Sequence, residues 1–197
     1  MGRIAIFILV MACVRLASAA IVFDDFTTDQ SGTGWLEIMD VIGGERDIRT
    51  ANPGNTVAVN GNAFSCSGPN AFSGCALDYD GIDHDASSTL TIPGFSPMDL
   101  TTGGQGAISV DVNVVQGGCN LSVELCDGQS TPMCASPGIT DVASGTHKFD
   151  YSDFTGVDPT QITAIRFVLT LRSNPSDCRI SAVGTTLGDY IFSDGFE

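Results

Sequence analysis

The feature that most constrains the fold is a strict alternation of apolar and polar residues between positions 106 and 126. The apolar positions are Ile108, Val110, Val112, Val114, Leu121, Val123 and Leu125. Successive side chains of a strand point to opposite faces, so each half of this segment has one apolar and one polar face. Residues 116–118 (Gln-Gly-Gly) separate the halves and predict a hairpin of two antiparallel strands. The pattern favours a β-sandwich and says nothing about chemistry.

Short alternating segments continue along the rest of the chain, separated by turns rich in Gly, Pro and Asn. One example is a strand at residues 75–80, followed by a polar loop at 81–87 and a further strand at 88–92. Apolar residues do not recur with a helical period in any window. The sequence therefore predicts an all-β fold, an antiparallel two-sheet β-sandwich of jelly-roll or galactose-binding-like type.

The first residues resemble an export signal. Arg3 precedes the apolar run 4–12, and the small-residue site Ala17-Ser18-Ala19 follows that run. We therefore expect a signal peptide at 1–19, a β-sandwich domain at 20–186 and a C-terminal tail at 187–197. An alternative is a lipoprotein signal, with a lipid on Cys13. The signal peptide predicts a secreted, extracellular or outer-surface bacterial protein, and no further apolar segment of membrane length follows it in the sequence.

The expected mature chain is strongly acidic. Removing residues 1–19 also removes Arg3 and Arg15, which leaves six Lys and Arg residues against 23 Asp and Glu residues. The resulting formal charge of −17 would repel phosphate backbones and anionic lipid surfaces, so nucleic acid is not an expected partner. Solubility outside the cell explains this charge, and divalent-cation binding is the alternative.

The six cysteines of the expected mature domain predict three disulfides. Cys119 shares the parity of the inward-facing Leu121, and Cys178 shares that of Ile180 on a later strand, so both face the core. Cys126 has the opposite parity and faces outward. The predicted pairs are Cys119–Cys178 across the core and two bonds that close local loops, Cys66–Cys75 and Cys126–Cys134.

Acidic residues gather in two places that offer the oxygen ligands calcium prefers. The candidate metal ligands are Asp24, Asp25, Asp78, Asp80, Asp83 and Asp85. Residues 78–89 do not form an EF-hand loop, because Thr89 stands where that loop needs Glu. A solvated loop without a metal is the alternative for this cluster.

Trp35, the single tryptophan, is the candidate for stacking on a sugar ring, with Tyr79 as a second ligand-binding residue. The alternative is that Trp35 packs in the core. The chain contains no nucleophile elbow, His-Glu-x-x-His helix or phosphate-binding loop, and we predict no catalytic residue.

Three short stretches carry a family resemblance. Residues 23–26 (FDDF) and 43–48 (GGERDI) resemble the opening of uncharacterised exported bacterial β-sandwich proteins. The final residues 191–197 (IFSDGFE) resemble a tail that recurs on secreted bacterial proteins, and relatives often carry C-terminal sorting signals. The resemblance implies a sandwich fold and a tail addressed to export machinery, and it implies no activity.

These observations predict a non-enzymatic binding module, with carbohydrate as the first ligand class and calcium as a structural cofactor. A structural or adhesive surface protein that acts through protein contacts is the second hypothesis. A glycan-active hydrolase that uses two acids is the third.

Overall fold

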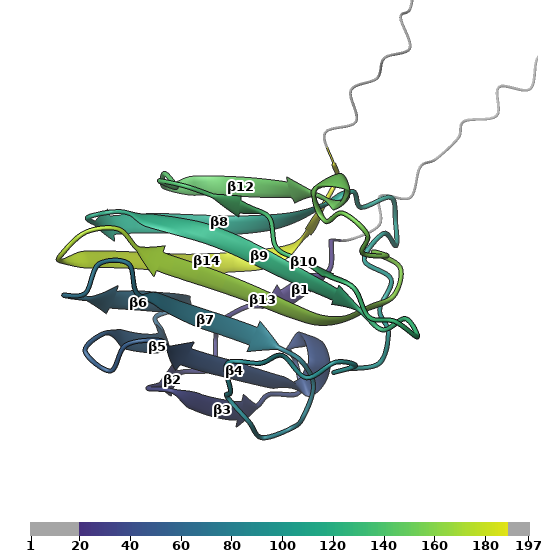
Figure 1. The fold of residues 1–197 in the computed structure, drawn as a ribbon, viewed down its shortest axis with the longest axis horizontal. Helices are drawn as coiled ribbons and strands as arrows, with labels where there is room; N and C mark the ends of the chain where they lie inside the picture. The colour runs from purple at the N-terminus through teal and green to yellow at the C-terminus, as the bar shows by residue number, and fades with distance from the viewer. Residues whose placement is uncertain (1–19, 189–197) are drawn as a thin grey trace, which may run out of the picture.

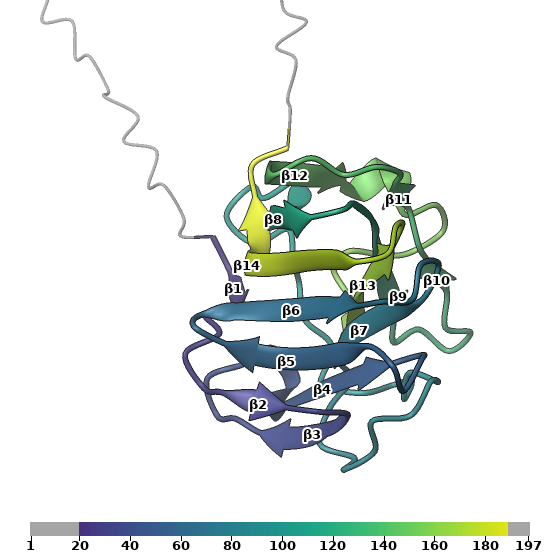
Figure 2. The same ribbon diagram turned by 90° about the vertical axis from the view of Figure 1, so that its left-hand side faces the viewer.

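Two antiparallel β-sheets of seven strands each pack face to face in the computed structural model, which describes residues 20–188 (Figures 1 and 2). Sheet A contains, in spatial order, β12 (Gly145–Asp150), β8 (Ala107–Gln116), β14 (Ser176–Thr186), β6 (Ala63–Gly68), β5 (Thr56–Asn60) and β2 (Gln30–Ser31), with β1 (Val22–Asp24) paired to β14. Sheet B contains β10 (Cys134–Ala135), β9 (Cys119–Asp127), β13 (Ile162–Leu171), β7 (Gly74–Tyr79), β4 (Glu45–Thr50) and β3 (Gly34–Glu37), with β11 (Gly138–Ile139) paired to β9. The predicted fold class is confirmed.

Two 3₁₀ turns, η1 (Ile42–Gly44) and η2 (Tyr151–Asp153), are the helical elements between residues 20 and 188. This part of the chain therefore holds no helix that could span a membrane. The predicted signal peptide at 1–19, and the tail from residue 189 onward, lie outside the described residues.

The alternating segment at 106–126 forms two strands, but the predicted hairpin is wrong. Strand β8 pairs with β12 and β14 in sheet A, whereas β9 pairs with β13 in sheet B. Residues 116–118 therefore carry the chain from one sheet to the other. Gly117 adopts a φ of 75°, which favours glycine, and a Cβ at this position would collide with Ser173 and Ser176. Both strands still bury their predicted face, because the two sheets share one core.

The core lies between the sheets and is built from the inward positions of every long strand. Ile108, Val110 and Val123 are fully buried, as their alternation predicts. The ring of Phe167 lies 6.3 Å from those of Phe23 and Tyr79, so aromatic packing joins β1, β7 and β13.

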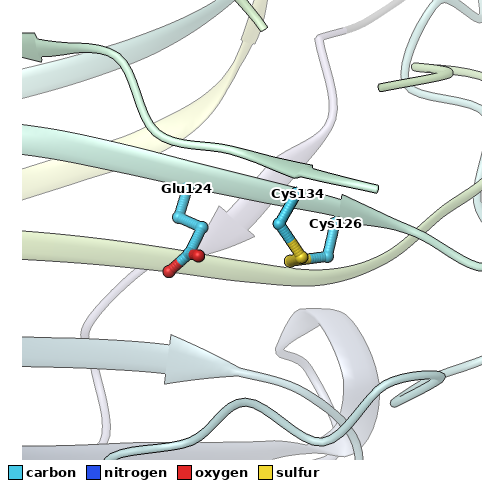
Figure 3. Close-up of side chains that lie close together, drawn as sticks. All are labelled: Glu124, Cys126 and Cys134. Atoms are coloured by element: carbon cyan, nitrogen blue, oxygen red, sulfur yellow. A yellow bond between two sulfur atoms is a disulfide. The ribbon is translucent and has the colours of Figure 1, made fainter. Parts of the chain in front are cut away.

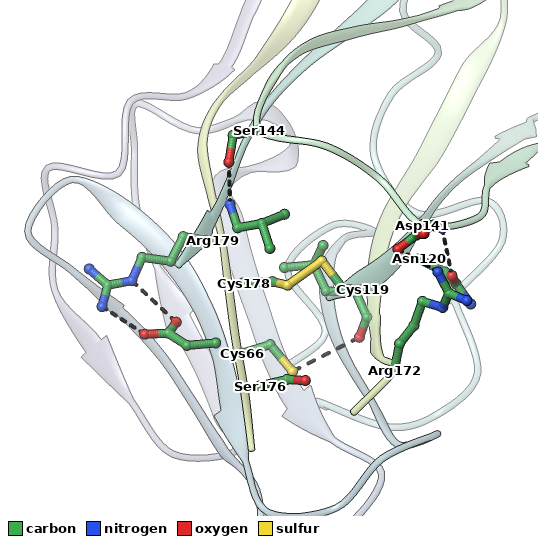
Figure 4. The surroundings of a disulfide bond; sticks show 12 residues. Cys66, Cys119, Asn120, Asp141, Ser144, Arg172, Ser176, Cys178 and Arg179 are labelled. Atoms are coloured by element: carbon green, nitrogen blue, oxygen red, sulfur yellow. Dashed lines mark hydrogen bonds and ion pairs between the residues drawn. A yellow bond between two sulfur atoms is a disulfide. The ribbon is translucent and has the colours of Figure 1, made fainter. Parts of the chain in front are cut away.

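All three predicted disulfides are present, and two of them connect the sheets. Cys119–Cys178 links β9 to β14 across the core (Figure 4). Cys66–Cys75 also crosses between sheets, from β6 to β7, so it does more than close a local loop. Cys126–Cys134 joins residues directly opposite each other on β9 and β10, within sheet B.

The segment between β7 and β8 covers part of the outer face of sheet B. Residues 88–92, predicted as a strand, form no strand here. Leu90 instead packs on Cys126 and Ala164 in a small apolar cluster separate from the main core. Cys126 therefore faces away from the core, as predicted, and yet is fully buried.

Candidate functional site

Strand β4 sends its charged side chains to two different sides of sheet B. Because strand residues alternate, Arg46 and Ile48 point into the core, whereas Glu45, Asp47 and Arg49 point to the outer face. Glu45, Arg46 and Asp47 are all at most 1% exposed. A buried charge is costly unless another group pairs with it. The two sides of β4 differ in the groups that surround these three side chains.

On the inner side, Arg46 forms an ion pair with Asp24. Its Nη1 donates to Asp24 Oδ2 at 2.9 Å, and its Nε donates to Gln30 Oε1 at 3.0 Å. Asp24 also accepts from the hydroxyl of Tyr79 at 2.9 Å and from the backbone N–H of Phe26 at 2.7 Å. The two short motifs at 23–26 and 43–48 thus meet in the core through one salt bridge.

This ion pair and its hydrogen bonds involve Asp24 and Tyr79, which the sequence predicts to bind a metal and a ligand, respectively. Asp24 is fully engaged with Arg46 and does not approach the other candidate metal ligands, and Asp25 is exposed and bonded to Thr27. Tyr79, predicted to bind ligand, is completely buried, and its pKa is raised well above the usual value by burial and by Asp24. The position of Tyr79 excludes a surface role, because its parity on β7 turns it inward.

A ladder of opposite charges crosses the outer face of sheet B. Arg166 on β13 donates to both oxygens of Asp78, at 2.8 and 2.9 Å, and contacts Glu124 at 3.4 Å. Arg49 adds a third contact to Asp78 at 3.4 Å. The charge of Asp78 is therefore balanced by two arginines. This pairing distinguishes Asp78 from the carboxyl groups described next, which have no arginine partner.

Four other carboxyl groups form what we call the acidic cluster: Glu45 and Asp47 on β4, Asp80 after β7, and Asp83 on the following loop. One oxygen from each of Glu45, Asp47 and Asp83 lies within 4.8 Å of the other two. Asp80 lies beside Asp47, and its Oδ2 accepts from the backbone N–H of Thr91 at 2.7 Å. The five arginines between residues 20 and 188 all pair with other carboxylates, so none of them forms an ion pair with these four.

Several oxygens of the acidic cluster lack hydrogen-bond partners. Neither oxygen of Asp47 has a hydrogen-bond partner, and Oδ1 of Asp80 lacks one as well. Burial, together with the neighbouring Asp80, Glu45 and Asp83, raises the pKa of Asp47 to about 9, and burial raises the pKa of Asp80 to about 6. Concentrating four acids in one covered place is costly unless a positive charge or a proton joins them.

Trp35 lies at the edge of the same face, 45% exposed. The ring of His84 lies against it, with a centroid distance of 4.4 Å and an interplanar angle of 44°. His84 is held in turn by Glu45, which accepts from its backbone N–H and contacts its Nδ1, both at 2.9 Å. Glu37, which follows Trp35 on the outward side of β3, approaches His84 Nε2 at 3.5 Å. The exposed indole is therefore backed by a fixed ring.

Two glycines in η1 allow the covering segment to approach β4. Gly43 and Gly44 have φ values of 81° and 82°, a region that favours glycine. A Cβ on Gly43 would lie 3.0 Å from the ring of Phe95, and one on Gly44 would lie 3.2 Å from Ile82. The glycine pair of the 43–48 motif thus gives residues 82–95 room to pack beside the acidic cluster.

The structure brings together some predicted ligands and separates others. Asp80 and Asp83 belong to the acidic cluster, whereas Asp24 and Asp78 pair with arginines, and Asp85 is exposed on the loop. Sequence reasoning missed Glu45 and Asp47. Their shared parity on β4 places both on the outer face, and this signal was available in the sequence.

A second group of candidate ligands cannot bind a metal through sulfur. Glu124, Cys126 and Cys134 lie close together, but both sulfur atoms are joined in a disulfide (Figure 3). A disulfide has no thiolate to donate, and the thiolate is the form that binds metals.

A hollow of about 420 Å³ lies beside η2. This turn follows β12, the strand at the opposite edge of the sandwich from β3 (Figures 1 and 2). Thr101, Gln105 and Tyr151 contribute to its wall, and it borders Gly188, the last described residue. The hydroxyl of Tyr151 donates to the carbonyl of Leu100 at 2.8 Å, which fixes this ring in the fold.

Comparison with known proteins finds no matching family model and no matching curated sequence. Among solved structures, the chain is similar to the family 30 carbohydrate-binding module of a cellulosomal cellulase from Clostridium thermocellum (15% identity, 89% of this chain and 96% of that chain, TM-score 0.43). It is similar to the family 11 module of another cellulase from that organism (13%, 86% and 95%, 0.43).

An agarase, AgWH50C, gives a TM-score of 0.49 at 7% identity over 86% of this chain. The chain spans about a quarter of the length of that agarase, 25%. At these identities the likeness concerns the fold alone, and the fold is a two-sheet antiparallel β-sandwich that resembles those of carbohydrate-binding modules.

Proposed function

We propose that this chain is an extracellular, non-enzymatic binding module that holds a neutral glycan against Trp35. The observation that carries the proposal is an indole that is 45% exposed on a sheet face and backed by the His84 ring. A large aromatic side chain normally buries its surface, so exposure in a fixed orientation favours a ligand that stacks on it. The apolar face of a pyranose ring fits such a surface.

The charges around Trp35 narrow the glycan class. Glu37 is 57% exposed beside the indole, and the acidic cluster lies on the same face of the sheet. Sulfated or uronate-rich glycans would be repelled here, whereas neutral sugars would meet only hydrogen-bonding groups.

Burial supports a binding role over hydrolysis. A glycosidase needs carboxyl groups that reach the bond being cleaved. Asp47 and Asp80, whose raised pKa values would suit an acid, are only 1% and 3% exposed beneath the 82–95 segment. We therefore assign the exposed aromatic, and no pair of acids, to the ligand.

Three further features of the proposal concern the setting of this module. Three disulfides are typical of proteins that fold in an oxidising compartment, which supports a place outside the cell. Export through residues 1–19 and recognition of the tail by export machinery remain proposals. Calcium also remains one, with Asp80 and Asp83 kept as ligands.

Replacing Trp35 with alanine should lower affinity for the bound glycan by about 30-fold or more, the effect of losing a central aromatic contact. The measurement is binding to an array of neutral, uronate-containing and sulfated glycans, followed by titration of the best neutral ligand. Trp35→Phe should retain much of the affinity, because it keeps an aromatic face.

Phe72 offers a matched control for this experiment. It is 84% exposed on the β6–β7 connection, away from Trp35, and Phe72→Ala should leave binding unchanged. Equal loss in both variants, or no neutral glycan bound by the parent protein, would refute the proposal. The second result would favour the alternative function, a structural or adhesive surface protein that acts through protein contacts.

A further inference from the structure

We propose that Glu45, Asp47, Asp80 and Asp83 bind a divalent cation of the calcium type, which fastens the loop after β7 to the outer face of sheet B. Two of these ligands, Glu45 and Asp47, come from β4, and the other two follow β7 within four residues. The cation site itself does not depend on the glycan proposal.

The first support is convergence from separate elements. Oxygens of Glu45, Asp47 and Asp83 lie within 4.8 Å of one another, and Asp80 adjoins Asp47. Calcium takes six to eight oxygen ligands at about 2.3–2.6 Å and tolerates irregular geometry, so small side-chain shifts around an ion would complete such a site. Magnesium needs near-ideal octahedral geometry and retains its waters, and it fits a covered cluster of four carboxylates less well.

The second support is independent of clustering. Asp47 is 1% exposed, and neither of its oxygens has a hydrogen-bond partner. Asp80 is 3% exposed, with Oδ1 also unpartnered. Buried carboxylates normally have donors, as the neighbouring Asp78 does with Arg166 and Arg49. The unpartnered oxygens therefore need a cation, or a proton shared between Asp47 and Asp80.

Charge distinguishes these two alternatives. One shared proton would neutralise a single carboxylate and leave Glu45 and Asp83 negative within the same cluster. A divalent cation would neutralise two charges and contact all four groups, and it would join the strand residues to the loop. Addition of the cation should therefore stabilise the fold, whereas a shared proton would already be in place and would make the protein indifferent to calcium.

The proposed cation site also lies close to Trp35, whose fluorescence can report on binding. Glu45 accepts from the backbone N–H groups of Asp83 and His84, at 3.2 and 2.9 Å, and the His84 ring lies 4.4 Å from that of Trp35. Trp35 is the single tryptophan, so tryptophan fluorescence excited at wavelengths that tyrosine does not absorb reports on this location alone. A cation bound to Glu45 and Asp83 should alter the contact between Glu45 and the His84 ring, and so change the emission of Trp35.

The experiment uses the purified, oxidised chain, stripped with chelator and then titrated with calcium chloride, with sodium chloride at equal ionic strength as the control for screening. Calcium at about 100-fold above its Kd should raise Tm by about 5–10 °C and change Trp35 fluorescence with the same midpoint. Excess chelator should reverse both changes. No shift in Tm at millimolar calcium would overturn the site and support the shared proton.

Single substitutions test which carboxylates bind the calcium. Asp47→Asn should fold, because it removes a charge that has no partner, and it should lose at least 10-fold in calcium affinity. Asp85→Asn makes the same chemical change on the same loop, outside the acidic cluster, and should keep both responses. Calcium binding that survives Asp47→Asn would overturn the ligand assignment. A Tm shift without a fluorescence change would overturn the connection through His84, whatever the result with glycans.

Discussion

Replacing Arg46 with methionine should lower the free energy of unfolding by about 3–5 kcal/mol, the cost of removing one partner from a buried ion pair. Methionine fills much of the arginine volume, so the loss would come mainly from the electrostatics. Asp24 would keep only the donors from Tyr79 and Phe26 for a carboxylate that is 2% exposed. Urea denaturation at constant pH measures the change.

The chain supplies a control for this variant in Arg179. Its guanidinium is paired with Asp177 at 3.0 Å, but its side chain is 43% exposed, so Arg179→Met should cost no more than about 1 kcal/mol. A double variant, Asp24→Leu with Arg46→Met, should be less destabilised than the sum of the single changes, because no unpaired charge remains. Similar losses for Arg46→Met and Arg179→Met would contradict the buried ion pair.

Alternation predicted which faces are buried, and it could not predict which strands pair. Ile108 and Val123 are both buried as expected, although their strands lie in different sheets. An inward-facing residue has the same apolar character in either layer of a sandwich, and a short Gly-rich connection suits a hairpin or a crossing between sheets. The same parity did predict Cys119–Cys178, because a bond across the core needs two inward residues and no knowledge of strand order.

The candidate site was predicted in part. Divalent-cation binding was the alternative explanation of the acidic composition, beside solubility, and the sequence does not say which carboxylates meet an arginine. Asp78 is bound by Arg166, 88 positions away, and Asp24 by Arg46, 22 positions away. Such pairs depend on strand order, which alternation leaves open. The acidic cluster consists of carboxylates that have no arginine partner. Half of it comes from β4, where alternation alone puts Glu45 and Asp47 on one face.

Removing the Cys119–Cys178 disulfide by a double alanine substitution should lower the free energy of unfolding by about 4 kcal/mol, because the bond closes a loop of 59 residues in the unfolded chain. The same change at Cys126–Cys134, with a separation of 8, should cost about 2.5 kcal/mol. Denaturation under non-reducing conditions gives both values.

The Cys66–Cys75 disulfide distinguishes two possible sources of stability, the restriction of the unfolded chain and the covalent link between the sheets. Its separation of 9 is close to the separation of 8 for Cys126–Cys134, yet it joins β6 of sheet A to β7 of sheet B. If restriction of the unfolded chain is the main effect, the two short-loop variants should lose about the same stability, roughly 2.5 kcal/mol. A loss at Cys66–Cys75 equal to that at Cys119–Cys178 would contradict this, and would show that a covalent link between the sheets matters more than the length of the loop it closes.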